Sequence, residues 1–160
     1  MSECQKPAPS GLDGSDGLLL DQQLCFALYA ASRAVVQSYQ PYLEPLQLTY
    51  PQYLVMLVLW EGDGVTVKAI GERLFLDSGT LTPLLKRLEA SGFVSRTRSG
   101  LDERQVLIHL TTTGKALREQ AVAMRGQMQC DFEAQLGEAA GMREQLQKLL
   151  GQLRNLKAGV

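Results

Sequence analysis

The sequence predicts a mainly α-helical fold with a small β-hairpin wing, arranged as a winged helix-turn-helix with terminal dimerisation helices. Three observations predict this fold. Two short helical segments joined by a tight turn lie between Thr66 and Leu88 of the 160-residue chain. Two short β-prone segments follow between residues 93 and 110. Amphipathic helical patterns at both ends carry more apolar surface than so small a module can cover.

The chain opens with a segment that has little to bury. Residues 1–17 are rich in Pro, Gly, Ser and Asp, and we interpret them as a flexible N-terminal arm. From Leu20 to Tyr39 apolar residues recur at helical spacing, until Pro41 ends the pattern. This pattern predicts a first helix.

The next two segments predict a buried helix and the first half of the helix-turn-helix. A helix that is apolar nearly all round is expected from about Pro51 to the turn at Gly62–Gly64. Thr66 is placed to cap a short helix, which a break at Phe75–Leu76 ends.

A further helix follows directly, with apolar residues at i, i+3, i+4 and i+7: Leu81, Leu84, Leu85 and Leu88. Its start has two solutions. If it begins at Ser78, Pro83 removes one internal hydrogen bond, whereas Thr82 as the cap would place Pro83 without strain at the first helical position.

The wing and the C-terminal helices complete the pattern. Residues 93–98 and 105–110 predict a hairpin around the loop 99–104, and His109 is interpreted as a strand residue without an obvious partner. Thr111 or Thr112 caps a long amphipathic helix, and a last helix follows Gly141.

These elements suggest one domain over residues 18–160. Residues 18–48 and 112–160 are assigned to dimerisation helices, and residues 51–110 to the winged helix-turn-helix.

Composition excludes several other classes of protein. No apolar run approaches the roughly 18 residues that a membrane span needs, and the N-terminus lacks a signal-peptide pattern, so we expect a soluble, cytoplasmic protein without a membrane partner. The three cysteines, Cys4, Cys25 and Cys130, suit neither a secreted disulfide framework nor a zinc site. They are expected to be reduced thiols, and we expect no metal and no cofactor.

Positive charge is concentrated where the DNA-binding part is predicted. The whole chain carries −1, but Val67 to Arg104 has seven basic and five acidic residues, a local charge of +2 that leaves −3 elsewhere. Side chains expected near the major groove are Ser78, Thr80, Thr82, Lys86 and Arg87. The expected wing contacts are Arg96, Arg98 and Arg104, of which Arg98 and Arg104 flank the loop and can enter a minor groove. For any one arginine, a solvated surface charge is an equally good interpretation.

The order of these elements resembles the MarR family of winged-helix dimers. The wing residues Asp102–Arg104 and the stretch Val106–Leu117 carry this resemblance. Leu24–Tyr29, Leu48–Tyr53 and Leu76–Glu89 resemble more closely the organic-hydroperoxide-sensing repressors of the OhrR type. The match spans roughly residues 21–117, with a looser tail.

The resemblance implies a redox mechanism. It makes Cys25 the sensor, places Tyr39 and Tyr50 as its hydrogen-bonding supports, and makes Cys130 the resolving cysteine of a two-cysteine branch. Cys25 and Tyr39 lie fourteen residues apart on one predicted helix, about 21 Å along its axis, so the tyrosine must come from the other subunit of a homodimer. The implied partners are an inverted-repeat operator in double-stranded DNA, an organic hydroperoxide as oxidant and cellular thiols as reductant.

Two other functions remain open at the level of sequence. A related regulator with a structural Cys25 would leave DNA on binding a phenolic ligand, and insensitivity to cumene hydroperoxide would favour it. A thiol peroxidase would begin with the same chemistry and would turn over peroxide with a thiol donor. The chain lacks a thioredoxin-like strand order, so we expect a regulator and not an enzyme.

Overall fold

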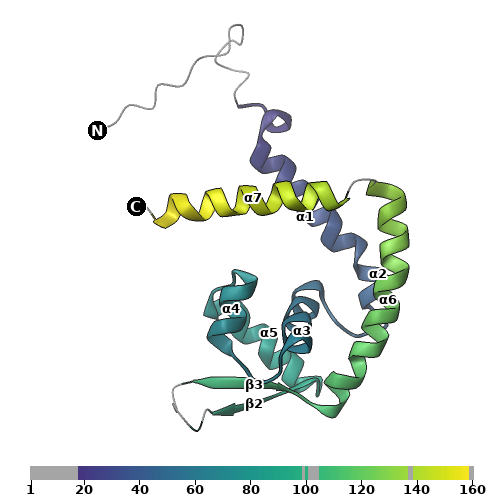
Figure 1. Ribbon diagram of the computed structural model, residues 1–160, viewed down its shortest axis with the longest axis vertical. Coiled ribbons are helices and arrows are strands. Elements are labelled where there is room, and N and C mark those ends of the chain that lie inside the picture. The colour runs from purple at the N-terminus through teal and green to yellow at the C-terminus, as the bar shows by residue number, and fades with distance from the viewer. Residues whose placement is uncertain (1–17, 99, 101–104, 137–138, 159–160) are drawn as a thin grey trace, which may run out of the picture. The chain divides into compact units, whose positions relative to one another are not determined.

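The computed structural model describes residues 18–98, 100, 105–136 and 139–158. It divides into two units, Met1–Gln40 and Pro41–Val160, and each is described by itself. The arm assigned to residues 1–17 lies outside the described residues. Figure 1 shows the elements, which are α1 (Leu24–Ser38), α2 (Gln40–Leu43), α3 (Tyr50–Glu61), β1 (Val65–Thr66), α4 (Val67–Leu74), α5 (Ser78–Ala90), β2 (Val94–Arg98), β3 (Val106–Leu110), α6 (Thr112–Leu136) and α7 (Ala139–Ala158).

The first unit contains a 3-10 turn, Leu20–Gln22, followed by α1. The predicted helix over 20–39 is therefore shorter than expected, because Gln23 is extended and separates the turn from α1. Within α1, whose fifteen residues are all described, no side chain is buried. Its large exposed apolar side chains are Leu24, Tyr29, Val35 and Val36. An uncovered apolar face of this kind requires a packing partner.

The core of the second unit is built around α3. Thr49 caps this helix, and its backbone N–H donates to the Gln52 side-chain oxygen at 2.8 Å. Pro51 sits in the first turn, where a missing N–H costs nothing. The most deeply buried side chains come from α2, α3, α4, α5 and β3: Leu43, Val55, Met56, Leu59, Ile70, Leu81, Leu85, Leu88 and Ile108.

The helix-turn-helix forms as predicted, and its second helix begins at Ser78, the earlier of the two starts that the sequence allowed. The Thr66 hydroxyl accepts from the Ala69 N–H at 3.1 Å and caps α4, which ends at the left-handed Phe75. Asp77 caps α5 by accepting from the Thr80 N–H at 2.9 Å. Pro83 therefore lies inside α5, as in the first of the two alternatives, and removes one backbone hydrogen bond.

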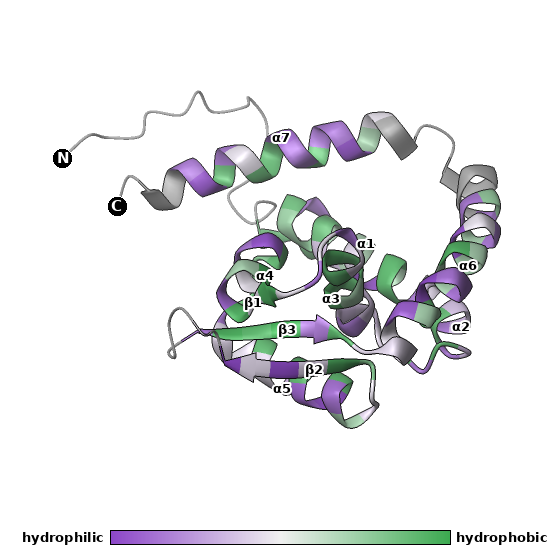
Figure 2. Ribbon diagram, turned by 60° about the horizontal axis from the view of Figure 1, so that its bottom comes forward, coloured by the Kyte–Doolittle hydropathy of each residue, from purple (hydrophilic) through white to green (hydrophobic). Residues whose placement is uncertain are grey.

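The wing is a three-stranded antiparallel sheet in the order β1-β3-β2. β2 and β3 pair from Val94–Leu110 to Arg98–Val106, which confirms the predicted hairpin. The third strand, β1, was not predicted from the sequence. Its two residues pair Val65 with Ile108 and Thr66 with Leu107. Figure 2 shows β3 as mainly hydrophobic and the edge strand β2 as more hydrophilic, in agreement with their positions in the sheet.

The C-terminal helices begin close to their predicted starts. The Thr111 hydroxyl accepts from the Gly114 N–H at 3.0 Å and caps α6, while α7 begins at Ala139, slightly before Gly141. On α6, Leu117, Ala121 and Met124 are buried. α7 exposes a second apolar stripe: Met142, Leu146, Leu150 and Leu153. Among the described helices, none has the length and hydropathy of a membrane span.

Candidate nucleic-acid interface and redox thiols

The outward side of α5 carries the residues predicted to contact the major groove. Leu81, Leu85 and Leu88 point into the core, so Lys86 and Arg87 are exposed on the other side of the helix. Ser78 and Thr80 are also exposed, at the first turn. A helix with basic residues along one face and short polar residues at its N-terminus suits the major groove of DNA.

Hydrogen bonds fix the first turn of α5. The Thr80 hydroxyl donates to the Asp77 carboxylate at 3.0 Å, and the Thr82 hydroxyl donates to the Ser78 carbonyl at 2.7 Å. The bonds from the Thr80 backbone N–H and hydroxyl lower the pKa of Asp77. Because both threonine protons are used within the turn, each hydroxyl oxygen retains lone pairs that can accept from a base or a bridging water.

The three wing arginines differ in their surroundings. Arg96 is partly buried, and its guanidinium lies 4.0 Å from the Glu89 carboxylate, which joins β2 to α5. Arg98 is exposed at the end of β2, next to the loop. Arg104 lies outside the described residues. Of the two described arginines, Arg98 is the one placed to reach beyond the protein surface.

The described cysteines are both free and exposed. Cys25 is the second residue of α1, and Cys130 lies on α6. They belong to different units, so each is described separately. Cys4 lies outside the described residues. Exposure leaves both described thiols accessible to an oxidant.

The two tyrosines that the resemblance implies as supports of Cys25 differ in position. Tyr39 is the C-terminal cap of α1 and is partly buried, so an unbroken helix separates it from Cys25 by about 21 Å. Tyr50 begins α3, and burial raises the pKa of its phenol.

A third tyrosine, which the sequence left without a role, lies beside the segment that carries Cys130. The Tyr42 hydroxyl on α2 donates to the carboxylate of Asp131, the neighbour of Cys130 on α6. This bond is the largest of the effects that raise the pKa of Tyr42. It attaches α2 to the turn of α6 that holds the cysteine.

The sequence did not reveal a polar cluster at the base of the wing. His109 is a strand residue as predicted, but it has partners. Its Nε2 lies 3.1 Å from the Thr97 hydroxyl, and its Nδ1 lies 4.0 Å from the Asp63 carboxylate. Asp63 also contacts Leu110 and Lys115, far away in sequence. The only local signal was a polar residue between two glycines, which also fits an ordinary turn.

Comparison with known proteins identifies regulators of the same kind. Residues 37–120 match the family described as transcriptional regulator SarA/Rot. The chain is 55% identical over 111 residues to the organic hydroperoxide resistance transcriptional regulator of Bacillus subtilis (strain 168), covering 69% of this chain and 76% of that protein. It is 49% identical over 154 residues to the transcriptional regulator TtmR of Methylorubrum extorquens (strain PA1), covering 92% and 79%. These relatives are regulators and not enzymes, as expected from the sequence.

Solved structures confirm the predicted fold. Reduced AbfR bound to DNA superposes with a TM-score of 0.76 at 38% identity, covering 88% of this chain and 96% of that chain. AbfR, from Staphylococcus epidermidis, has also been solved overoxidised on DNA, with a TM-score of 0.72, and with a disulfide formed, with a TM-score of 0.58.

Proposed function

Because the chain belongs to the MarR family of winged-helix transcription regulators, we propose that it is a dimeric repressor that leaves its operator when an organic hydroperoxide oxidises Cys25. The observation that carries the proposal is the 55% identity to the organic hydroperoxide resistance regulator. The free, exposed thiol of Cys25 in the first turn of α1 supports it.

DNA is bound by α5 and the wing. Ser78, Thr80, Thr82, Lys86 and Arg87 approach the major groove, while wing arginines reach the adjacent minor groove. AbfR, which has this fold, has been solved on DNA. A two-fold dimer presents two such units, so the operator is an inverted repeat.

The dimer forms through the terminal helices. α1 exposes Leu24, Val35 and Val36, and α7 exposes Met142 and Leu153. Burying these side chains between two subunits supplies about 25 cal/mol per Å² of apolar surface. We assign residues 18–48 and 112–160 to this interface and residues 51–110 to DNA binding.

Oxidation begins at Cys25. The thiolate sulfur attacks one oxygen of the hydroperoxide, the O–O bond breaks, and an alcohol leaves after protonation, so that Cys25 becomes a sulfenic acid. In this proposal the sulfur lies beside two groups of hydrogen-bond donors: the N–H groups at the start of α1, and the phenols of Tyr50 and of Tyr39 of the partner subunit.

Resolution then links the two subunits. The thiolate of Cys130 of the partner subunit attacks the sulfenic sulfur, hydroxide leaves as water, and a disulfide forms. A disulfide requires Cα atoms within roughly 7 Å. We expect Cys25 and Cys130 to be further apart than this in the DNA-bound form, so that the dimer rearranges on bridging and loses its operator spacing. Two equivalents of a cellular thiol reduce the bond and restore DNA binding.

The test is DNA binding with and without oxidant. The probe is the duplex that the reduced wild-type protein selects from random-sequence DNA. Cumene hydroperoxide should release the wild type, and dithiothreitol should restore it, whereas Cys25→Ser should bind equally well and stay bound. Release of the serine variant by peroxide would remove Cys25 as the sensor. Release of both proteins by a phenolic ligand alone would favour a ligand-responsive regulator instead.

A further inference from the structure

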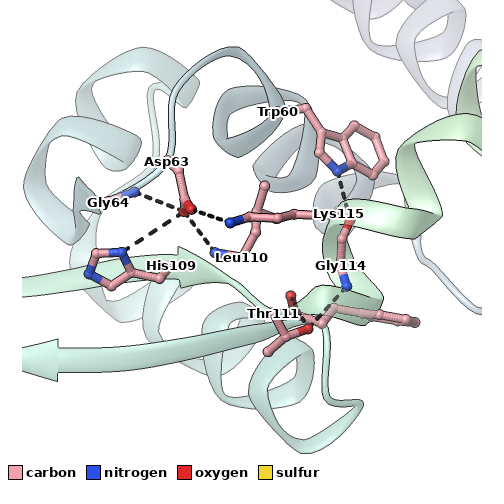
Figure 3. Close-up of polar contacts among 9 residues, drawn as sticks. Trp60, Asp63, Gly64, His109, Leu110, Thr111, Gly114 and Lys115 are labelled. Atoms are coloured by element: carbon pink, nitrogen blue, oxygen red, sulfur yellow. Dashed lines mark hydrogen bonds and ion pairs between the residues drawn. The ribbon is translucent and has the colours of Figure 1, made fainter.

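Asp63 lies where three elements meet: the turn after α3, the end of β3 and the start of α6. Its carboxylate accepts from the Leu110 N–H at 2.8 Å and from the Gly64 N–H at 2.9 Å. The Lys115 ammonium lies 3.3 Å away, and the His109 ring faces the same carboxylate at 4.0 Å. Figure 3 shows all four groups directed at Asp63. One side chain thus connects α3, the wing and α6.

The carboxylate continues the β-sheet where the backbone of β1 stops. β1 and β3 pair antiparallel, with Val65 opposite Ile108, so the same register places Asp63 opposite Leu110. At that position the Leu110 N–H is bonded to a side-chain oxygen. We call the end of β3 at Leu110 the root of the wing. Asp63 holds it, because β1 does not extend that far along β3.

Neighbouring contacts fix the first turn of α6 in the same place. The Trp60 indole N–H donates to the Gly114 carbonyl at 2.9 Å, and the Thr111 hydroxyl donates to the Gly92 carbonyl at 2.6 Å. Trp60 precedes Asp63 by three residues, so the end of α3 and the turn after it both contact the first turn of α6. The first turn of α6 is thus attached to the winged helix-turn-helix of its own chain.

We propose that Asp63 is a positioning residue for operator binding, which holds the root of the wing so that Arg98 and α5 meet the DNA in a fixed relation. This inference rests on the proposed function. Arg98 lies at the far end of a five-residue strand, four residues beyond Val94 and thus about 13 Å from the root at roughly 3.3 Å per residue. A rotation of about 10° at the root would move it by about 2 Å, enough to break a hydrogen bond.

Two variants distinguish the effect of the position of the Asp63 oxygen from the effect of its negative charge. Asp63→Asn keeps an oxygen at the same place for the two N–H groups but loses the charge, whereas Asp63→Glu keeps the charge and displaces the oxygens by one methylene. We expect Asp63→Asn to bind the selected duplex within about twofold of the wild type, and Asp63→Glu to bind it about fivefold to tenfold more weakly. The opposite order would make Asp63 a simple charge and would overturn the inference.

Glu61→Gln is the matched control. Glu61 lies two residues away and also forms an ion pair, but with Arg73 of α4 at 2.6 Å. It should change binding by less than about twofold, because an exposed ion pair contributes little. A loss equal to that of Asp63→Glu would mean that any charge lost near this turn has the same effect, and would overturn the inference.

A double-mutant cycle tests whether Asp63 acts through the wing. Asp63→Ala and Arg98→Ala should be non-additive, since a wing without its arginine gains nothing from correct placement. Asp63→Ala and Lys86→Ala should add, because Lys86 lies on α5. If Asp63→Ala does not fold, Asp63→Glu replaces it in both cycles. Additivity with Arg98→Ala would overturn the inference. If the wild type selects no duplex at all, the proposed function itself fails.

Discussion

Gly114 shows how one residue fixes the connection between the wing and α6. It is buried, and a Cβ on it would overlap the Phe93 carbonyl oxygen and also meet the Leu110 side chain. Because the obstacle is backbone, it cannot rotate away. Only glycine lets α6 approach the α5–β2 turn this closely.

Gly114→Ala should therefore lower the free energy of unfolding by about 3 kcal/mol, the upper range for overpacking in a core. Gly126→Ala on the same helix is the control, since a Cβ there meets nothing within 4 Å. It should raise stability by about 0.5–1 kcal/mol through helix propensity. Urea unfolding at one protein concentration, followed by fluorescence of the single Trp60, measures both. Equal effects of the two alanines would contradict the close approach.

The Asp63 carboxyl also makes stability depend on pH. Burial pushes its pKa up, but the Leu110 and Gly64 N–H groups and Lys115 outweigh this and hold the pKa below its ordinary value of 3.8. A carboxyl with a lowered folded pKa stabilises the fold above the unfolded value, and this contribution is lost as pH falls through the folded value.

The wild type should consequently lose stability relative to Asp63→Asn as pH falls below about 4, while the difference between them stays constant at neutral pH. Urea unfolding of both proteins over a pH series measures this difference. Parallel curves down to acid pH would show that the carboxylate is not held by these donors.

At the scale of elements, sequence patterns were sufficient to predict the helices and strands that are long enough to show them. The apolar spacing from Leu81 to Leu88 predicted α5, and the β-prone segments predicted β2 and β3. β1 escaped prediction because two residues have no period, and they form a strand only beside β3. α2 was missed because Pro41 was interpreted as an end, although proline is tolerated in the first turn of a helix.

The candidate site divides in the same way. Cys25 and the residues of α5 were proposed from local sequence, since motif and helix face are local properties. The Asp63 cluster was not found, because it joins residues 47 positions apart. Such a contact depends on the register of β1 against β3, and no pattern in the sequence indicated β1.

The start of α5 supports a prediction at this scale. Asp77→Ala removes the acceptor for the Thr80 N–H and hydroxyl, so the first turn should fray and operator affinity should fall about threefold to fivefold. Asp77→Asn retains a capping oxygen and should bind like the wild type. Competition binding with the selected duplex measures both. Since each variant removes a negative charge near DNA, tighter binding by both would indicate that repulsion outweighs capping.

At the scale of the whole molecule, the terminal helices are the reason for which we propose a dimer. α1 buries none of its own residues, and it places Tyr39 a full helix length from Cys25. A sensor made of Cys25 and a tyrosine at that distance requires a second subunit. In the proposed function, the dimer therefore provides both the cover for the apolar faces and the completion of the redox site.

The last prediction concerns Cys130, because it tests chemistry and assembly together. After mild treatment with cumene hydroperoxide, non-reducing electrophoresis should show a covalent dimer that dithiothreitol reverses. Cys130→Ser should give no such dimer, should stop at the Cys25 sulfenic acid, and should overoxidise under stronger treatment. Mass spectrometry of the Cys25 peptide identifies each state.

Cys4→Ser is the control for this experiment, and it should leave the cross-link intact. A covalent dimer that survives Cys130→Ser but disappears in Cys4→Ser would transfer the resolving role to the N-terminal segment. If neither variant affects the cross-link, Cys25 of one subunit must bond to Cys25 of the other. A wild type that leaves DNA without any covalent dimer would place the switch at the sulfenic acid or at a mixed disulfide with a small thiol, with Cys130 as an ordinary exposed residue of α6.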